Sequence, residues 1–142
     1  MKIIIAALLL LTNTLTSTNL TAQENQTEND VKKNLMKIFE LSKNKDNKTL
    51  ASYIQYTGPD VERKRKDVCN PKNEEELLEV IKIRERINKL LQEKYKLTSF
   101  IAKEHPTNQN KSWYVWEVKF DSKTVIFAFQ KLNEKYILGD ID

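Results

Sequence analysis

Few side chains in this sequence could act together in acid–base, nucleophilic or metal chemistry. His105 is the only histidine and Cys69 the only cysteine among 142 residues, so a three-histidine zinc site and an intrachain disulfide are excluded. His105 precedes Pro106 in a polar stretch, where we expect an exposed ring, whereas a general base must reach bound substrate. Gly-rich phosphate loops and serine-nucleophile motifs are absent. We therefore predict no catalytic residue, no metal and no cofactor.

Arg84 is the polar residue that packing explains least. It falls inside the apolar arc of a helix predicted over residues 73–94, and Asn88 lies near the edge of that arc. The arc is formed by Leu77, Val80, Ile81, Ile87 and Leu91. A guanidinium that faces a core needs a carboxylate or a ligand, and Asp140, set among apolar residues near the C-terminus, is the partner we predict. The pair is either a structural contact, with the arginine stem lying on apolar surface, or the polar end of a ligand pocket. The candidate pocket residues are Arg84, Asp140, Tyr53, Tyr56, Asn88 and Trp116.

The first 22 residues have the order of a secretory signal peptide. Met1–Lys2 is a short charged start, Ile3–Leu11 is an unbroken apolar run, and small polar residues follow as far as Ala22. The apolar run is about half the roughly 20 residues that a membrane-spanning helix needs, so we expect no stable membrane span. We predict a signal peptide over residues 1–22, export to the periplasm or secretion, and a flexible stretch over residues 23–28. A buried N-terminal strand is the alternative.

Residues 29–142 carry the pattern of one α+β domain. Helical spacing begins with Val31, Leu35, Ile38 and Phe39 and stops at the polar residues 42–47. A second short helix is predicted over residues 49–56, followed by a turn at Gly58-Pro59 and an irregular loop over residues 61–70. The third helix is predicted over residues 73–94, with carboxylates in its first turn, where the helix dipole favours them.

The last third of the chain alternates with the period of β-strands. Strands are predicted over residues 97–104, 112–120, 123–132 and 135–142. Tyr114, Trp116, Val118 and Phe120 share one face. Asn133-Glu134 is a two-residue turn, and short links make an antiparallel meander the simplest order. We predict N-terminal helices packed on a curved, mainly antiparallel C-terminal sheet.

Charge and exposed aromatic residues limit the partners. The net charge of +4 is too small, and its signs too interspersed, to indicate nucleic-acid binding. The basic run 63–66 is flanked by acids and is predicted to be a solvated loop. Trp113 is expected on the sheet face away from the helices, where a homodimer could form. Cys69 is expected to be a partly buried free thiol, with an interchain disulfide as the alternative.

The order of these elements resembles the NTF2-like, cystatin-like superfamily, in which two helices and a long third helix precede a curved sheet. The likeness is to small exported bacterial members grouped as domains of unknown function. It includes the tail Tyr136-Ile137-Leu138-Gly139-Asp140-Ile141-Asp142, residues 50–56 with Gly58-Pro59, and residues 125–129. The resemblance implies a cone-shaped α+β fold over residues 31–142. It leaves function open, because the superfamily contains both enzymes and non-catalytic binding domains.

Three functions are consistent with these residues. The first is an exported non-catalytic binding or structural domain that holds a small apolar ligand or a protein partner. The second is an isomerase- or cyclase-like enzyme that uses Asp140, with Tyr53 or Tyr56 as proton donor. The third is a periplasmic inhibitor or interaction protein that uses the sheet face or residues 61–70. The absence of a histidine dyad favours the first.

Overall fold

The computed structural model describes the backbone of residues 2–142 and the side chains from Thr21 onward. The chain divides into two compact units, Met1–Asp30 and Val31–Asp142. Helix α1 (Lys2–Lys43) includes the predicted signal peptide, most of whose side chains lie outside the described residues. Residues 23–28, expected to be flexible, are also helical. Among the residues described, no helix is long and apolar enough to cross a membrane.

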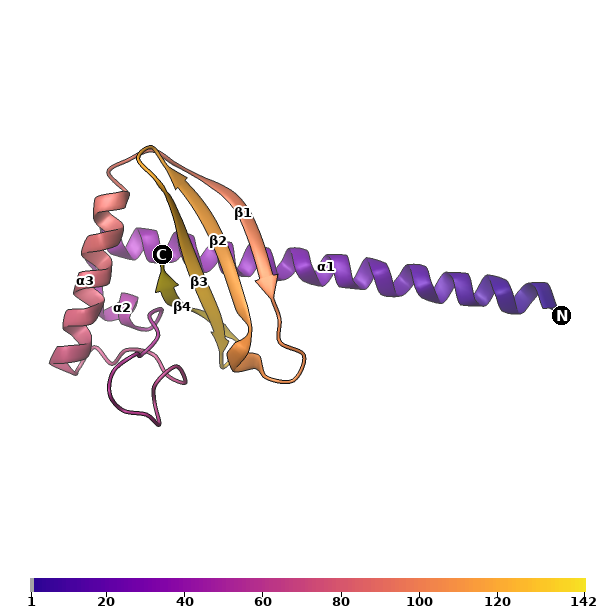
Figure 1. Ribbon diagram of the computed structural model, residues 1–142, viewed down its shortest axis with the longest axis horizontal. Coiled ribbons are helices and arrows are strands. Elements are labelled where there is room, and N and C mark those ends of the chain that lie inside the picture. Colours follow the sequence, from indigo (N-terminus) through magenta and orange to yellow (C-terminus); the bar gives the residue numbers. More distant parts are fainter. Residues whose placement is uncertain (1) are drawn as a thin grey trace. The chain divides into compact units, whose positions relative to one another are not determined.

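Helices α1, α2 (Asn47–Ala51) and α3 (Glu74–Leu90) precede the sheet (Figure 1), and polar side chains cap the starts of α2 and α3. Helix α2 is capped by Asp46, which accepts a hydrogen bond from the Thr49 amide, and α3 is capped by Asn73. Helix α3 ends at Leu90, four residues before the predicted end, because the chain turns there into the first strand. All three predicted helical segments exist, with shorter α2 and α3.

The four strands are β1 (Tyr95–Lys103), β2 (Trp113–Phe120), β3 (Thr124–Leu132) and β4 (Lys135–Ile141). They form one antiparallel sheet in the order β1-β2-β3-β4, so the predicted meander is confirmed. The turn between β3 and β4 is Asn133-Glu134, with φ of 47° and 65°. Positive φ at both residues is the geometry that two-residue hairpin turns require. Register shifts in β1–β2 and β3–β4 are irregularities of the kind that bend strands.

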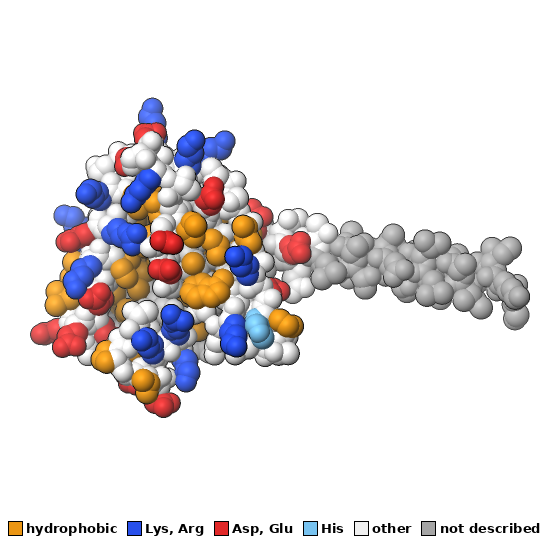
Figure 2. Space-filling model, viewed as in Figure 1, with side chains coloured by type: hydrophobic (Ala, Val, Ile, Leu, Met, Phe, Trp, Pro, Cys, Tyr) orange, Lys and Arg blue, Asp and Glu red, His pale blue; other side chains and the backbone are white. Residues whose placement is uncertain are grey.

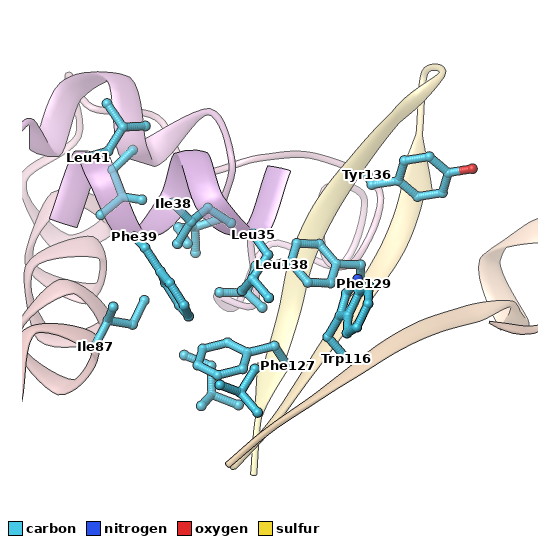
Figure 3. Close-up of a cluster of buried hydrophobic side chains, with 14 of the residues drawn as sticks. Leu35, Ile38, Phe39, Leu41, Ile87, Trp116, Phe127, Phe129, Tyr136 and Leu138 are labelled. Atoms are coloured by element: carbon cyan, nitrogen blue, oxygen red, sulfur yellow. The ribbon is translucent and has the colours of Figure 1, made fainter. Parts of the chain in front are cut away.

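The core of the second unit lies between the helices and one face of the sheet. Phe39 of α1 packs edge-on against Phe127 of β3 (Figure 3), and the two ring centroids are 5.4 Å apart. Phe39 also packs edge-on against Tyr95 of β1, at the same centroid distance of 5.4 Å. The inner face carries the predicted set Tyr114, Trp116, Val118 and Phe120, all buried. Full burial of each such side chain contributes about 1.5–3 kcal/mol. The fold is therefore α+β, with N-terminal helices packed on a curved antiparallel sheet that is not closed into a barrel.

Helix α2 is shorter than predicted because residues 53–55, expected to be its last turn, pair with β4 instead. The Gln55 amide donates to the Leu138 carbonyl at 2.9 Å, and the Leu138 amide donates to the Tyr53 carbonyl at 2.8 Å. On the other side, Gln55 forms an antiparallel bridge with Val68. Sequence-distant pairing of this kind overrides local helical spacing, which carries only local information.

Candidate functional site

A cleft of about 740 Å³ lies between the first half of α3 and residues 54–60. Its apolar lining includes Ile54, Pro59, Cys69, Leu78 and Ile83. Its charged lining includes Asp60, Arg63, Glu75, Glu76, Glu79 and Lys82. Residues 57–70 form one side of the cleft. They belong to the loop between α2 and α3 in Figure 1.

The floor of the cleft is held by backbone pairing on both sides. Residues 53–55 bond to β4, as described above. On the opposite side, the Tyr56 amide donates to the Asp67 carbonyl and the Cys69 amide donates to the Ile54 carbonyl, each at 2.9 Å. Residues 53–56 therefore lie beside β4 at the edge of the sheet and are held by backbone hydrogen bonds on both sides.

Arg63 ties the loop to α3. Its Nη1 and Nη2 donate to the two carboxylate oxygens of Glu76 at 2.7 and 3.1 Å, and its Nε donates to Asp67 at 2.8 Å. Its Nη2 also donates to the Val68 carbonyl at 3.1 Å, and its guanidinium carbon lies 4.2 Å from the centre of the Tyr56 ring. We call the group Tyr56, Arg63, Asp67 and Glu76 the arginine clamp.

The clamp satisfies a carboxylate that is otherwise costly to bury. Glu76 is 8% exposed, and it accepts a third hydrogen bond, from the Asn70 amide at 2.6 Å. The hydrogen bonds from Arg63 lower the pKa of Glu76 below its usual range, although burial acts in the opposite direction. Arg63 likewise lowers the pKa of Asp67, and its own pKa is raised by these two carboxylates. All three groups are therefore charged at neutral pH.

The remaining charges of the cleft lie on its rim. Lys82 pairs with Glu79 at 2.6 Å, and Asp60 accepts a hydrogen bond from the Glu62 amide at 3.0 Å. Glu75 is exposed and has no polar partner among the described residues. Leu78 adds an exposed apolar surface, with 55% of its area accessible. The rim therefore offers carboxylates and apolar surface.

Cys69 lies in the wall of the cleft as a buried free thiol. It is 5% exposed, and its sulfur lies 3.7 Å from the Gln55 carbonyl. Burial is the main reason that its pKa is raised to about 11. The predicted buried thiol is confirmed, and little thiol surface is left for an interchain disulfide.

The predicted pairing of Arg84 with Asp140 is wrong. The Arg84 side chain is 13% exposed, and its Nη2 lies 3.4 Å from Glu85; its Nε is buried without a hydrogen-bond partner. Asp140 is exposed and accepts a hydrogen bond from the Ile141 amide at 2.9 Å. The two side chains form no ion pair within the described part of the chain.

A register shift explains the orientation of Asp140. Strict alternation would place Tyr136, Leu138 and Asp140 on the inner face. The shift between Ala128 and Phe129 leaves Gly139 as an extra residue, so Asp140 pairs with Ala128 and Ile141 pairs with Phe127. One inserted residue exchanges the two faces of a strand, and Ile141 is buried in place of Asp140.

Arg86, which the sequence pattern did not single out, is the arginine that reaches β4. Its Nη1 donates to the Ile141 carbonyl at 2.9 Å. Arg86 and Asp140 line a smaller cavity of about 140 Å³. This cavity shares Ile54, Gln55, Thr57 and Ile83 with the main cleft. No sequence signal marks Arg86, because its partner is a backbone carbonyl 55 residues away.

The structure does not bring the six predicted pocket residues together. Tyr56 lines the main cleft, and its hydroxyl accepts a hydrogen bond from the Asp60 amide at 3.1 Å. Tyr53 is half-buried, with the Lys135 ammonium 3.8 Å from its ring centre. Asn88 donates to the Ser42 carbonyl at 2.9 Å and so ties α3 to the end of α1.

Trp116 and His105 lie outside the cleft, one in the core and the other in an exposed turn. Trp116 is buried in the core, 5.3 Å from the Phe100 ring. His105 lies in the exposed turn, as predicted, where its Nδ1 accepts hydrogen bonds from the Thr107 and Asn108 amides. The described residues contain no group of three or more His, Cys, Asp or Glu side chains suited to a metal ion.

Comparisons with protein-family models, curated protein sequences and solved structures found no match to this chain.

Proposed function

We propose that residues 31–142 form an exported, non-catalytic binding domain whose ligand occupies the cleft between α3 and residues 54–60. The observation that carries this proposal is the cleft itself. Its volume of about 740 Å³ is within the range of roughly 300–1,000 Å³ that ligand sites have. Apolar side chains line its floor, and the arginine clamp holds its wall in place before a ligand arrives, which reduces the ordering cost of binding.

The polar groups of the cleft favour binding over catalysis. An enzyme of the isomerase or cyclase type would need a desolvated carboxylate within reach of a tyrosine hydroxyl. Asp140 is exposed and bonded to a backbone amide, and Glu76 is held as an ionised carboxylate in an ion pair with Arg63. The Tyr56 hydroxyl is bonded to the Asp60 amide. An enzymatic role for Asp140 remains the alternative, and it would require the small cavity beside Arg86 to hold substrate.

Membership of the NTF2-like superfamily and export are part of the same proposal. The helices-then-sheet order and the open, bent sheet support the first. The charged start and apolar run of residues 1–11 support the second.

The outer face of the sheet supports a second role, in a homodimer or with a partner protein. Ile101, Val115 and Ala128 are cross-strand neighbours there. Ile101 is 51% and Ile126 38% exposed, and Figure 2 shows hydrophobic side chains gathered in the middle of the face in view. Apolar patches of this kind mark interaction surfaces. Sedimentation equilibrium of wild type and of an Ile101→Lys variant tests it: a single-chain mass for the wild type at high micromolar concentration would count against it.

A fragment screen monitored by amide chemical shifts tests the cleft. Hits should perturb residues 54–60 and 75–83 together. Leu78→Trp should reduce these perturbations by filling the cleft, whereas Val61→Trp should not. Val61 is a suitable control because it is also an exposed hydrophobic residue, 73% accessible, and does not line the cleft. Hits scattered over the surface, or equal effects of the two variants, would refute the proposal.

A further inference from the structure

We infer that the ligand of this cleft is an extended peptide segment of a partner protein, apolar in its middle and carrying lysine or arginine. This inference rests on the proposed function and adds the chemical class of the ligand. It depends on three properties of the site: its length, its charge and its free main-chain groups.

The main cleft and the smaller cavity are neighbours, because they share four lining residues, and we infer that they form one groove. Along α3 the groove runs from Glu75 to Arg86, a distance of about 16 Å at 1.5 Å per residue. That length accommodates about five residues of extended chain. An elongated groove with an apolar floor fits a peptide better than a compact ligand.

The main cleft has the opposite charge to the protein as a whole. Four carboxylates (Asp60, Glu75, Glu76 and Glu79) and two cations (Arg63 and Lys82) line it, a formal net charge of −2, whereas the chain carries +4. A negatively charged cleft attracts cationic ligands and raises their local concentration.

Arg63 cannot readily receive an anionic ligand. A guanidinium has five N–H donors, and Arg63 uses four of them in hydrogen bonds to Glu76, Asp67 and Val68. A carboxylate or phosphate that binds Arg63 through two parallel hydrogen bonds would therefore have to break the arginine clamp, whereas an ammonium or guanidinium can approach Glu75 and Asp60 without disturbing it.

The turn at the edge of the groove offers main-chain groups to an incoming strand. The amides and carbonyls of Thr57 and Gly58 make no hydrogen bond to another described residue. Thr57 is exposed and lines both cavities. Peptides that pair with free backbone gain affinity from the main chain and specificity from alternate side chains.

Fluorescence anisotropy with labelled hexapeptides on the full chain tests this inference. We would compare Leu-Lys-Val-Leu-Lys-Ala with forms in which both lysines are replaced by glutamine or by glutamate. We expect the lysine peptide to bind most tightly and the glutamate peptide least, with a difference that shrinks as salt rises. The double variant Asp60→Asn/Glu75→Gln should weaken the binding of the lysine peptide about fivefold and leave the affinity for the glutamine peptide unchanged. Glu62→Gln/Glu74→Gln is the matched control, because it removes the same number of charges from exposed neighbours that do not line the cleft.

The outcomes separate the inference from the proposed function. Equal binding of all three peptides in the cleft would overturn the cationic preference and leave the binding function standing. Spermine binding as tightly as the lysine peptide would overturn the assignment to a peptide. If no peptide binds, the inference is overturned. The proposed function is overturned as well if the fragment screen also finds no hit in the cleft.

Discussion

Replacing Glu76 by glutamine should detach the loop of residues 57–70 from α3 and lower stability. The carboxylate is 8% exposed and accepts three hydrogen bonds, two from Arg63 and one from the Asn70 amide. Glutamine has nearly the same shape but places its NH2 group against a guanidinium donor or the amide donor. Each hydrogen bond to a charged group is worth about 1.5–3 kcal/mol, but Arg63 is 30% exposed and water can hydrate it once freed. We expect Glu76→Gln to cost about 1–3 kcal/mol of unfolding free energy.

Urea unfolding followed by tryptophan fluorescence measures this cost, and Glu75→Gln is the control. Glu75 is the adjacent carboxylate in the same first turn of α3, exposed and without a polar partner among the described residues. Its substitution removes the same charge and should change stability by less than about 0.5 kcal/mol. Equal effects of the two variants at pH 7 would refute the clamp as a source of stability.

The pH dependence gives a second test of the same interaction. The pKa of Glu76 in the folded protein is lowered by Arg63, and its unfolded pKa is about 4.3. Its contribution is therefore fully present above the unfolded value and is lost as the pH falls through the folded value. The difference between wild type and Glu76→Gln should be constant from pH 7 to about 5 and shrink at lower pH. A difference that grew on acidification would contradict the assignment.

Limited trypsin digestion tests the loop directly. The segment 63–66 contains four basic residues, and three of them are exposed while Arg63 is held by the clamp. Cleavage in Glu76→Gln should be faster than in Glu75→Gln, because a protease needs a locally opened chain. Identical digestion rates would mean that the loop is anchored by other contacts.

Three further predictions concern single residues. Gly139→Ala should cost about 1–3 kcal/mol in urea unfolding, because a Cβ there would lie 2.9 Å from Gln55 Oε1 and 3.1 Å from the Trp113 ring; an unchanged midpoint would contradict this. Cys69 should react slowly with Ellman's reagent at pH 8 in native buffer and rapidly in urea, since burial raises its pKa to about 11; rapid native reaction would contradict it. Glu134→Gly should raise stability by about 0.5 kcal/mol, because Glu134 has a φ of 65° that glycine adopts without strain; a loss of stability by thermal unfolding would contradict it.

The sheet and the inner stripe of α1 could be predicted from the sequence because their signals are local. Alternation over eight residues identifies the buried face of β2, and a two-residue turn at Asn133-Glu134 fixes the last hairpin. The pairing of residues 53–55 with β4 has no such signal, because it joins positions more than 80 residues apart. The orientation of Asp140 depends on one inserted residue in β4, which alternation alone does not locate.

The cleft was missed because the residues that build it have ordinary solvated patterns. Arg63 belongs to a basic run among acids, and Glu76 is one of three carboxylates that suit a helix start. The spacing of Arg63 and Asp67 is the one local hint of the clamp, since the two are four residues apart. Arg84 is the opposite case: its place in an apolar arc predicts a functional pair, yet its side chain is 13% exposed and its Nη2 contacts Glu85 on the same helix.

The arginine clamp determines both the shape and the charge of the groove. If Arg63 were free, its guanidinium would be the best anion receptor in the cleft, because its planar donors match a carboxylate or phosphate. Glu76 and Asp67 occupy three of the five donors. Asp67 is not itself part of the cleft lining. The clamp thus removes one cation from the reach of a ligand while it fixes the loop that closes the cleft. Asp60 and Glu75 are left to face an incoming ligand, and a positively charged side chain is the group that complements them.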